Sequence, residues 1–481
     1  GITDFQNFSG NNSEEPPANQ KIRKETTLTK ANQKLITGHK SVVRDEIVAR
    51  GDEIIELAKV VGANPEPGFD ELETSERAAG CLESLGLDVE RNLAITGLRA
   101  TRQFSPGGPT VAVLGELDSL RVPAHPDANP ETGAVHACGH HAQVGQLIGA
   151  AIGLSSESLA GHLNGSVAFI ATPAEEFIDV GRRLLRHQTG ELGFMSGKQE
   201  MIRIGTFDDV DMAMMVHTAS DGSKGTFSVG GASTAHVVQH VRFTGKAAHA
   251  GGAPWDGVNA LQAANISMMA INALRETFPA DDTIRVHGII TSGGIAVNSI
   301  PGEAIYEGRV RGRDNSIVDA MAIRIENCFK AGALAMGGVV EIVSMPGYMA
   351  LSTDETMDEL FAQNVEWFRG GDSVFRRQSL TSMGGSTDMG DLSQVMPVIH
   401  PFVSAAIGTA HGADYVIDDY EAAVVAPAVA MAMTVIDLLS NDALAAESII
   451  AESSPPMTRQ EYIDAQQARF KVVNYDARPT G

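Results

Sequence analysis

Cysteine, histidine and acidic side chains follow the ends of several apolar runs in this sequence. They are Glu116 and Asp118, Cys138 and His140, Glu175 and Glu176, His217, and His411. Thiolate, imidazole and carboxylate groups are ligands that suit Zn²⁺, Mn²⁺ or Co²⁺. Several carboxylates held close together are costly unless cations neutralise them. If the chain brings these residues to one place, their types predict a centre for two divalent metal ions.

Each of these residues also has a simpler interpretation. A histidine at a strand end is more often a hydrogen-bonded core residue than a ligand. Adjacent carboxylates such as Glu175 and Glu176 usually form a solvated corner, and a cysteine is commonly buried as a small apolar residue. The metal hypothesis therefore depends on the convergence of all these groups at one edge of one sheet.

The elements around these residues predict such a convergence. Apolar runs at 111–117, 166–171 and 211–216 predict buried strands, and segments at 43–60 and 142–154 predict helices. Near-continuous apolar strands that alternate with helices are typical of an α/β fold, with a mostly parallel sheet covered by helices on both faces. Functional residues of such sheets collect at the carboxyl ends of the strands, which is where the candidate ligands stand.

The pattern changes between residues 231 and 347. Strands are expected at 236–244, 283–291, 304–311 and 339–343, with helices at 256–277 and 317–336. This β-α-β-β-α-β order is the ferredoxin-like arrangement, and it predicts a small domain inserted into a larger one. The expected division is an N-terminal arm (1–35), a catalytic domain in two parts (36–230 and 348–440), the inserted domain (231–347) and a C-terminal tail without an assigned role (441–481).

Length and composition limit the class of protein. The chain has 481 residues, a net charge of −24 and 43% hydrophobic residues, which indicates a globular protein of two domains. Such an acidic chain lacks the basic surface that binds nucleic acid. The longest apolar run, 422–439, contains Pro427 and predicts a buried helix, so no membrane partner is expected. Three cysteines form no disulfide framework and the first residues show no signal-peptide pattern, so we expect a cytoplasmic protein.

Three motifs resemble those of a known family. They are His136-Ala-Cys-Gly-His140, Gly245-Lys-Ala-Ala-His249-Ala-Gly-Gly-Ala-Pro254 and Gly293-Gly-Ile-Ala-Val-Asn298-Ser-Ile-Pro301. They are similar to the aminoacylase and glutamate-carboxypeptidase metallopeptidases (family twenty), in the amidohydrolase branch with the auxin-conjugate and aminobenzoyl-glutamate hydrolases. The resemblance covers residues 65 to about 439. It implies a zinc-peptidase-like catalytic domain with an inserted lid domain, and hydrolysis of the amide bond of an N-acyl or N-aroyl amino acid, such as an aminobenzoyl-glutamate-like conjugate.

The resemblance also implies the metal ligands and the ions. Two divalent ions, most often zinc or manganese, would share the Cys138 thiolate, and the remaining ligands would be His140, Glu176, His217 and His411. Two such ions polarise an amide carbonyl and lower the pKa of a water molecule towards ~7.

Further roles follow from the same resemblance. Glu175 would be the general base, and Asp118 would orient a metal ligand. In the lid, His249 would stabilise the oxyanion in the active site of a neighbouring subunit, so a homodimer through the lid is expected. Asn298 and Arg311 would hold the carboxylate of the substrate, a small N-acyl amino acid. Without the resemblance, Arg311 would be interpreted as a surface residue of the arginine-rich run 309–313.

The sequence departs from the family at two positions. His141 follows Cys-Gly-His where this branch usually has aspartate, and Glu116 stands where relatives commonly have the first of two aspartates. His141 could add a metal ligand or only form a nearby hydrogen bond. His125, in a loop that the chain inserts after the first strand, is interpreted as a loop residue. The metal preference and the complete ligand set stay open.

Two other functions remain as alternatives. One is a dipeptidase that acts on small dipeptides, which only a panel of substrates can distinguish. The other is a catalytically silent protein that binds amino-acid conjugates. The presence of Glu175 together with a complete set of ligands argues against the silent protein.

Overall fold

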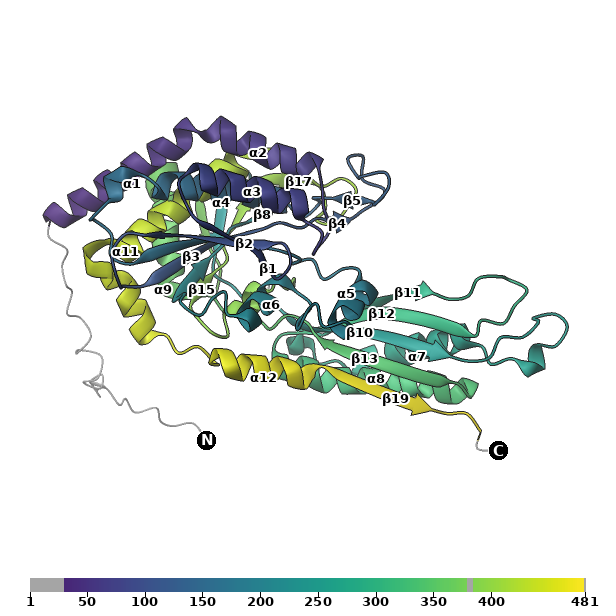
Figure 1. Ribbon diagram of the computed structural model, residues 1–481. Coiled ribbons are helices and arrows are strands. Elements are labelled where there is room, and N and C mark those ends of the chain that lie inside the picture. Colours follow the sequence, from purple (N-terminus) through teal and green to yellow (C-terminus); the bar gives the residue numbers. More distant parts are fainter. Residues whose placement is uncertain (1–29, 379–383, 480–481) are drawn as a thin grey trace, which may run out of the picture.

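The computed structural model describes residues 30–378 and 384–479 (Figure 1). Residues 1–29 of the expected N-terminal arm lie outside the described residues. The last residues of that arm, from Lys30 on, begin helix α1 (Lys30–Ala49). The single amphipathic helix expected at 43–60 is two helices, α1 and α2 (Gly51–Ala63). The chain leaves helical geometry at Arg50, with φ −104° and ψ 16°. Gly51, a poor helix former, then lies against Val425, where an added Cβ would already stand 3.4 Å from a methyl group.

A six-stranded sheet forms the centre of the larger body in Figure 1. Its order is β1 (Val89–Leu93), β2 (Gly97–Gln103), β6 (Ser166–Thr172), β3 (Thr110–Glu116), β7 (Met212–Met214) and β15 (Val398–Ile399). Strand β3 pairs in parallel with β6 and β7, and β7 with β15, whereas β1 and β2 are antiparallel. The expected mostly parallel α/β sheet is therefore confirmed.

Helices cover both faces of this sheet. Val111 and Val113 point into a core with α4 (His140–Leu154) and α11 (Ala426–Glu452). Ala112 and Leu114 point the other way, towards α6 (Gly197–Ile204), α10 (Met389–Leu392) and α12 (Arg459–Arg469). The segment 421–452 is long and apolar enough to cross a membrane, but 94% of its apolar window is buried inside the protein. It belongs to the larger core, as its sequence predicts, and its backbone leaves helical geometry at residues 440–443.

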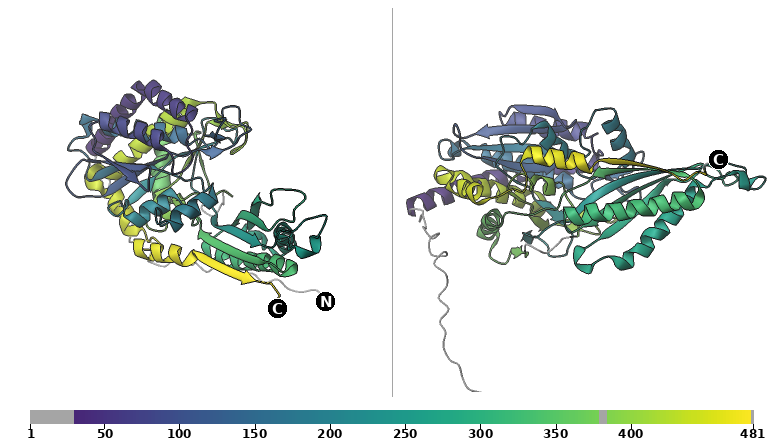
Figure 2. Two further views of the ribbon diagram at one scale, coloured as in Figure 1. Left: turned by 45° about the vertical axis from the view of Figure 1, so that its right-hand side comes forward. Right: turned by 90° about the horizontal axis from the view of Figure 1, so that it is seen from below.

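The inserted domain extends from the body as an arm (Figures 1 and 2). It follows the expected order β10 (Ala235–Thr244), α7 (Ala260–Leu274), β11 (Arg285–Ser292), β12 (Glu303–Gly312), α8 (Asn315–Met336) and β13 (Val339–Pro346). The buried side chains of β12, including Tyr306 and Val310, pack with those of α7 and α8 in one core. The sheet order is β11-β12-β10-β13-β19, and all of its pairs are antiparallel.

The C-terminal segment, to which the sequence assigned no role, spans both parts of the molecule. Helix α12 docks on the body, where Tyr462 Oη donates to Asp391 Oδ1 at 2.8 Å and Gln466 Nε2 donates to the same oxygen at 2.8 Å. Strand β19 (Lys471–Asp476) then adds a fifth strand to the lid sheet beside β13. In Figure 1 this yellow segment runs under the body and along the arm. The residues beyond 440 are therefore not a separate tail.

The remaining elements are shorter and connect these layers. Strand β8 (His217–Ala219) belongs to a second sheet of order β14-β9-β16-β8, with β14 (Val374–Arg376), β9 (Phe227–Val229) and β16 (Phe402–Ser404). The other elements are α3 (Leu72–Ser84), α5 (Val180–Gln188), α9 (Glu355–Arg369), β4 (Leu120–Arg121), β5 (Ala134–Val135), β17 (Ala406–Ile407) and β18 (Val416–Ile417).

Candidate metal centre

The five expected metal ligands lie together in the structure, as two groups of three that share one residue. The first group is Cys138, His140 and His217, and the second is Cys138, Glu176 and His411. Within each group the ligand atoms lie within 4.8 Å of one another. Because Cys138 belongs to both groups, its sulfur could serve as a ligand in each of them. A thiolate, imidazoles and a carboxylate are the donors that zinc and manganese sites use, so the residues fit a pair of divalent ions.

The ligands come from segments far apart in the sequence. Cys138 precedes α4, His140 is the first residue of α4, and Glu176 follows β6. His217 begins β8, and His411 lies in the loop between β17 and β18. His411 has a positive φ of 64°, which is uncommon outside glycine and clusters at functional sites. The edge of the sheet and this loop together position the two groups.

Gly139 allows the close approach of Cys138 and His140 to the sheet. Its φ is +94°, in the left-handed region that glycine adopts readily. A Cβ atom at this position would lie 2.1 Å from Thr218 Oγ1 and 2.8 Å from Tyr415 Oη. The Cys-Gly-His spacing is therefore required by packing as well as by backbone conformation.

The two inner histidines are oriented by backbone carbonyl groups. His140 Nδ1 lies 2.9 Å from Asp118 O, and His217 Nδ1 lies 2.7 Å from Thr218 O. Because a carbonyl oxygen can only accept, each Nδ1 carries a proton, and Nε2 is the nitrogen that a metal ion would use. His217 Nε2 lies 3.4 Å from Cys138 Sγ. This is the ring orientation that a metal ligand needs.

Charges at the centre favour the thiolate form of Cys138. Burial and Glu176 act to raise the pKa of Cys138, but His217 and His140 outweigh them and lower it to about 6. The Glu176 carboxylate raises the pKa of His411 to about 11, and their Oε1 and Nε2 atoms lie 3.2 Å apart. In the structure these ligands therefore neutralise one another as thiolate, carboxylate and imidazolium groups.

Asp118 and Glu175 border the ligand groups. Asp118 Oδ2 accepts from the Glu176 amide at 2.8 Å, and its Oδ1 lies 3.3 Å from His140 Nδ1. Glu175 is buried, and burial together with the nearby Glu116 and Glu176 carboxylates raises its pKa well above the ordinary value. A carboxyl group with a raised pKa can both accept and return a proton near neutral pH.

A buried ionic network supports the centre and was not predicted. Lys198 Nζ lies 2.6 Å from Glu116 Oε1 and 2.5 Å from Asp388 Oδ1, and its side chain is fully buried. Glu116 Oε2 is in turn 3.1 Å from His140 Nε2. Burial alone would raise the pKa of Glu116, but Lys198 and His140 lower it to about 2. Glu116, His140 and Glu175 form a third group of potential metal ligands, so Glu116 lies next to the two groups that share Cys138.

His141 lies outside all three ligand groups. Its Nε2 is 3.2 Å from Tyr420 Oη, and its ring centroid is 5.3 Å from that of His136. It lines a separate cavity of about 550 Å³ with His136 and His125. Of the two possibilities for His141, the structure supports a local hydrogen bond. His125 contacts the backbone at Tyr415 O and Asp127 N, in keeping with a loop residue.

Arg311 is the one expected substrate-binding residue that reaches the metal centre within this chain. It lines a cavity of about 470 Å³ together with Cys138, Glu175 and Glu176. His249 and Asn298 are exposed on the lid and do not line this cavity among the described residues. They are close to each other, because the Ala250 amide donates to Asn298 O at 2.9 Å.

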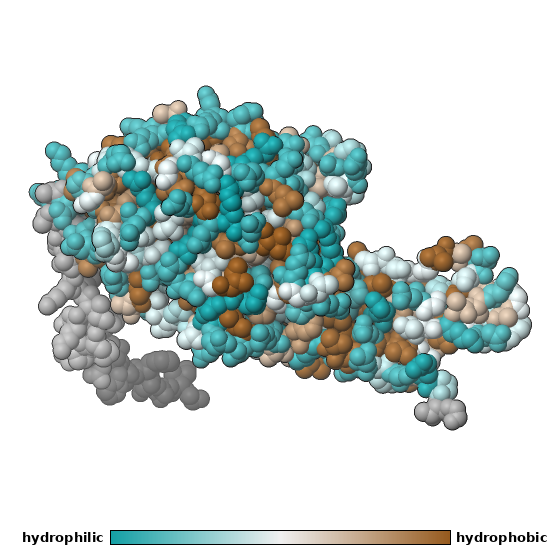
Figure 3. All heavy atoms as spheres, in the orientation of Figure 1, coloured by the Kyte–Doolittle hydropathy of each residue, from teal (hydrophilic) through white to brown (hydrophobic). Residues whose placement is uncertain are grey.

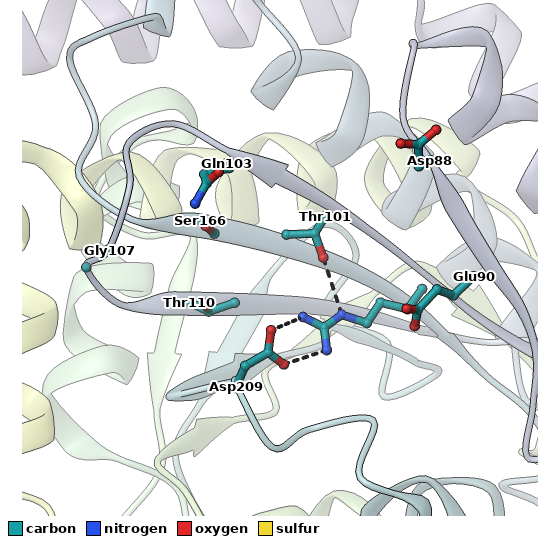
Figure 4. A pocket seen from close by; sticks show the side chains of 10 residues that line it. Asp88, Glu90, Thr101, Gln103, Gly107, Thr110, Ser166 and Asp209 are labelled. Carbon is teal, nitrogen blue, oxygen red and sulfur yellow. Dashed lines mark hydrogen bonds and ion pairs between the residues drawn. The ribbon is translucent and has the colours of Figure 1, made fainter.

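Another cavity, of about 630 Å³, lies at the opposite ends of the strands (Figure 4). It includes Thr110 at the start of β3 and Ser166 at the start of β6. The one guanidinium group on its wall, that of Arg99, is already held by Asp209 at 2.6 and 2.7 Å. Active sites of this fold lie at the carboxyl ends of the strands. This cavity lies at the amino ends, and its guanidinium group is already paired, so it does not resemble an active site.

Comparison with known proteins relates the lid and the fold to one group of enzymes. Residues 230–336 match the family model described as a peptidase dimerisation domain. Two solved structures share the fold. A dinuclear metal-binding peptidase of the M20 family from Bacillus subtilis has a TM-score of 0.59 at 21% identity, covering 81% of this chain and 99% of that chain. An aminobenzoyl-glutamate utilization protein from Klebsiella pneumoniae has a TM-score of 0.60 at 19% identity, covering 82% and 97%.

Curated relatives are similar over part of the chain. The Xaa-Arg dipeptidase of Mus musculus is 33% identical over 309 residues, which are 62% of this chain and 62% of the relative. One of the subunits of the p-aminobenzoyl-glutamate hydrolase of Escherichia coli is 29% identical over 306 residues, which are 62% and 59% of the two chains. The matched region therefore spans about three fifths of the length of these relatives.

Proposed function

Because the chain is related to the M20 peptidases, whose dimerisation domain it carries, we propose that it is a metal-dependent amidohydrolase of N-acyl or N-aroyl amino acids. The observation that supports this function most strongly is the pair of ligand groups that share Cys138. Glu175, which lies outside both of these groups, stands beside them on the wall of the same cavity. An aminobenzoyl-glutamate-like conjugate is the proposed substrate.

Different residues of the cavity activate the water, position the ligands and bind the substrate in the proposed reaction. Divalent ions held by the two groups would polarise the amide carbonyl and acidify the attacking water. Glu175 takes the proton from this water and returns it to the nitrogen of the leaving amine. Asp118 holds the Glu176 amide and the His140 ring in position. Arg311 binds the substrate carboxylate through its planar guanidinium group.

Metal removal tests this function. We expect chelation to abolish hydrolysis of 4-aminobenzoyl-glutamate and added Zn²⁺, Mn²⁺ or Co²⁺ to restore it. Cys138→Ala, which removes a ligand from both groups, should reduce the bound metal measured by elemental analysis, whereas His141→Asn should retain it. A metal-free protein that stays inactive with every ion would instead support the silent conjugate-binding alternative.

A dipeptidase is the second candidate, and the similarity to the Xaa-Arg dipeptidase favours it. The same chemistry cleaves an acyl amide and a peptide bond, so the ligand groups do not separate the two. Dipeptides with a C-terminal arginine belong in the same substrate panel. Higher kcat/KM for these dipeptides than for aroyl amino acids would favour this candidate.

We also propose that the protein is a homodimer through the lid and that His249 acts in the partner's active site. The lid exposes large apolar side chains, namely Trp255, Met269, Ile289, Ile295 and Val297, and Figure 3 shows apolar atoms on the arm. His249 Nδ1 accepts from the Gly251 and Gly252 amides at 3.2 and 2.9 Å. Its Nε2–H is therefore free to donate to an oxyanion.

Mixing two inactive variants tests the shared active site. His249→Ala lacks the oxyanion donor, and Glu175→Gln lacks the general base. In a mixed dimer, the site of the His249→Ala subunit has its own Glu175 and receives His249 from the other subunit. We expect activity to return after the variants are mixed under conditions that exchange subunits. Each variant mixed with itself is the control, and no recovery in exchanged dimers would contradict the proposal.

A further inference from the structure

The cavity beside the metal centre has one strongly basic wall. Its volume is about 470 Å³, and Glu175, Glu176 and His411 lie on the wall formed by the body. The facing residues include Arg309 and Arg311 of the lid strand β12. A single substrate carboxylate needs one guanidinium group, as Arg311 already provides. The lid side of the cavity therefore presents one more guanidinium group than a single carboxylate requires.

Arg309 and Arg311 point in the same direction from one strand. The exposure of β12 alternates, so that Tyr306, Gly308 and Val310 are buried while Arg309 and Arg311 are half-buried. Residues two apart on a strand lie on the same face, and their Cα atoms are about 6.6 Å apart. Two guanidinium groups at this spacing can each hold one carboxylate of the same small molecule.

Glu175 and Glu176 are near enough to Arg311 to act against the lowering of its pKa, but within the described residues neither arginine is directly paired with a carboxylate. Arg311 instead contacts Ser386 Oγ at 2.8 Å and His287 Nε2 at 3.1 Å. Burial and the neighbouring Arg309 lower the pKa of Arg311 to about 10. Two partly buried cations side by side are unfavourable, and an anionic ligand would relieve their repulsion.

Arg309 is fixed in place before any ligand arrives. One guanidinium nitrogen donates to Phe177 O, and the group lies 6.0 Å from the centroid of the Phe177 ring. Arg377 lies 5.3 Å from the centroid of the Phe402 ring, and Asp221 is the acidic group near it. Groups that are already oriented bind a ligand at a smaller entropic cost.

We propose that Arg309, assisted by Arg377, binds a second carboxylate of the substrate, so that the amino acid released is a dicarboxylic one of the aspartate or glutamate class. This inference rests on the proposed amidohydrolase function. Arg311 would bind the α-carboxylate of the substrate, and Arg309 would bind its side-chain carboxylate; we call the second position the Arg309 subsite. A leaving amino acid with a basic side chain would face the guanidinium groups of Arg309 and Arg311, which disfavours arginine at this position.

Substrates that differ only in charge test the subsite. For the wild type we expect kcat/KM for 4-aminobenzoyl-glutamate to exceed that for 4-aminobenzoyl-glutamine roughly 10- to 100-fold, as for one charge-assisted bidentate contact. In Arg309→Met the ratio of the two kcat/KM values should fall to within about 3-fold. Only kcat/KM for 4-aminobenzoyl-glutamate should decrease, while that for 4-aminobenzoyl-glutamine should stay the same. Arg376→Met is the matched control, because Arg376 is outside the cavity and pairs with Glu359 at 2.7 Å. It should keep the wild-type preference.

A binding measurement separates failure of the subsite from failure of the proposed function. Isothermal titration of the metal-loaded protein with free glutamate and free glutamine needs no hydrolysis. Tighter binding of glutamate in the wild type, lost in Arg309→Met, would support the subsite even if no conjugate were cleaved. Equal binding of the two amino acids, or equal hydrolysis of the two conjugates by the wild type, would overturn the proposal. A similar loss for both conjugates in Arg309→Met would also overturn it.

Discussion

Glutamine in place of Glu175 is expected to lower kcat by about 10²- to 10⁴-fold while the protein keeps its metal. Glutamine has nearly the same shape as glutamate, but it cannot accept the proton of the attacking water. Glu175 belongs to neither of the groups that share Cys138, so its replacement leaves all five ligands in place. Steady-state kinetics, together with elemental analysis of the same sample, measure both quantities.

The adjacent residue provides a matched control for this variant. Glu176→Gln removes a carboxylate that lies 3.2 Å from His411 and forms part of one ligand group. This variant should lose metal as well as activity, and added metal should restore part of the activity. If Glu175→Gln retained the wild-type kcat, or lost its metal as Glu176→Gln does, Glu175 would not be the general base.

Methionine in place of Lys198 is expected to have the largest effect on stability. Lys198 is fully buried, and its ammonium group lies between the carboxylates of Glu116 and Asp388 at 2.6 and 2.5 Å. Burial would lower the pKa of Lys198, but these carboxylates raise it above its ordinary value. Without the lysine, the buried carboxylate of Asp388 loses its paired cation and Glu116 keeps only His140. Breaking a buried pair in this way costs about 3–5 kcal/mol of the free energy of unfolding.

Urea denaturation followed by circular dichroism measures this loss. Lys224→Met is the control, because Lys224 pairs with Asp418 at 3.1 Å while its side chain is 59% exposed. Exposed pairs contribute about 0–1 kcal/mol, so the control should unfold close to the wild type. The double variant Lys198→Met/Asp388→Asn should recover part of the stability, because it removes one uncompensated charge. Equal unfolding midpoints for Lys198→Met and Lys224→Met would contradict this account of the network.

Part of the candidate metal centre could be predicted from strand ends, because Glu176 follows β6 and His217 comes three residues after β7. Strand boundaries follow from apolar runs, and parallel strands bring their carboxyl ends to one edge. The position of His141 could also have been predicted. Consecutive residues on a helix point about 100° apart, and His140 and His141 are the first two residues of α4. Because His140 points towards the candidate metal centre, His141 must point away from it.

The ionic network could not be predicted in the same way. Lys198 lies 82 residues from Glu116 and 190 residues from Asp388 in the sequence. A lysine after Ser-Gly at the start of a short helix has the pattern of a solvated residue. Its burial follows from the packing of α6 and α10 against the sheet, which local patterns do not contain. Strand β19 was missed for a similar reason, because its partner β13 is more than a hundred residues earlier in the chain.

The return of the C-terminal segment to the lid changes how the lid is attached. A domain inserted into another is joined to it by two chain segments, and two attachments allow rotation about the line between them. Here a third connection crosses between the two parts, because α12 is hydrogen-bonded to the body through Asp391 and β19 is paired with the lid sheet. This connection restricts that rotation, so the separation between the lid arginines and the metal ligands depends on a segment that contains neither. We therefore expect substitutions in α12 to change the position of the lid relative to the candidate metal centre, although α12 contributes no residue to that centre.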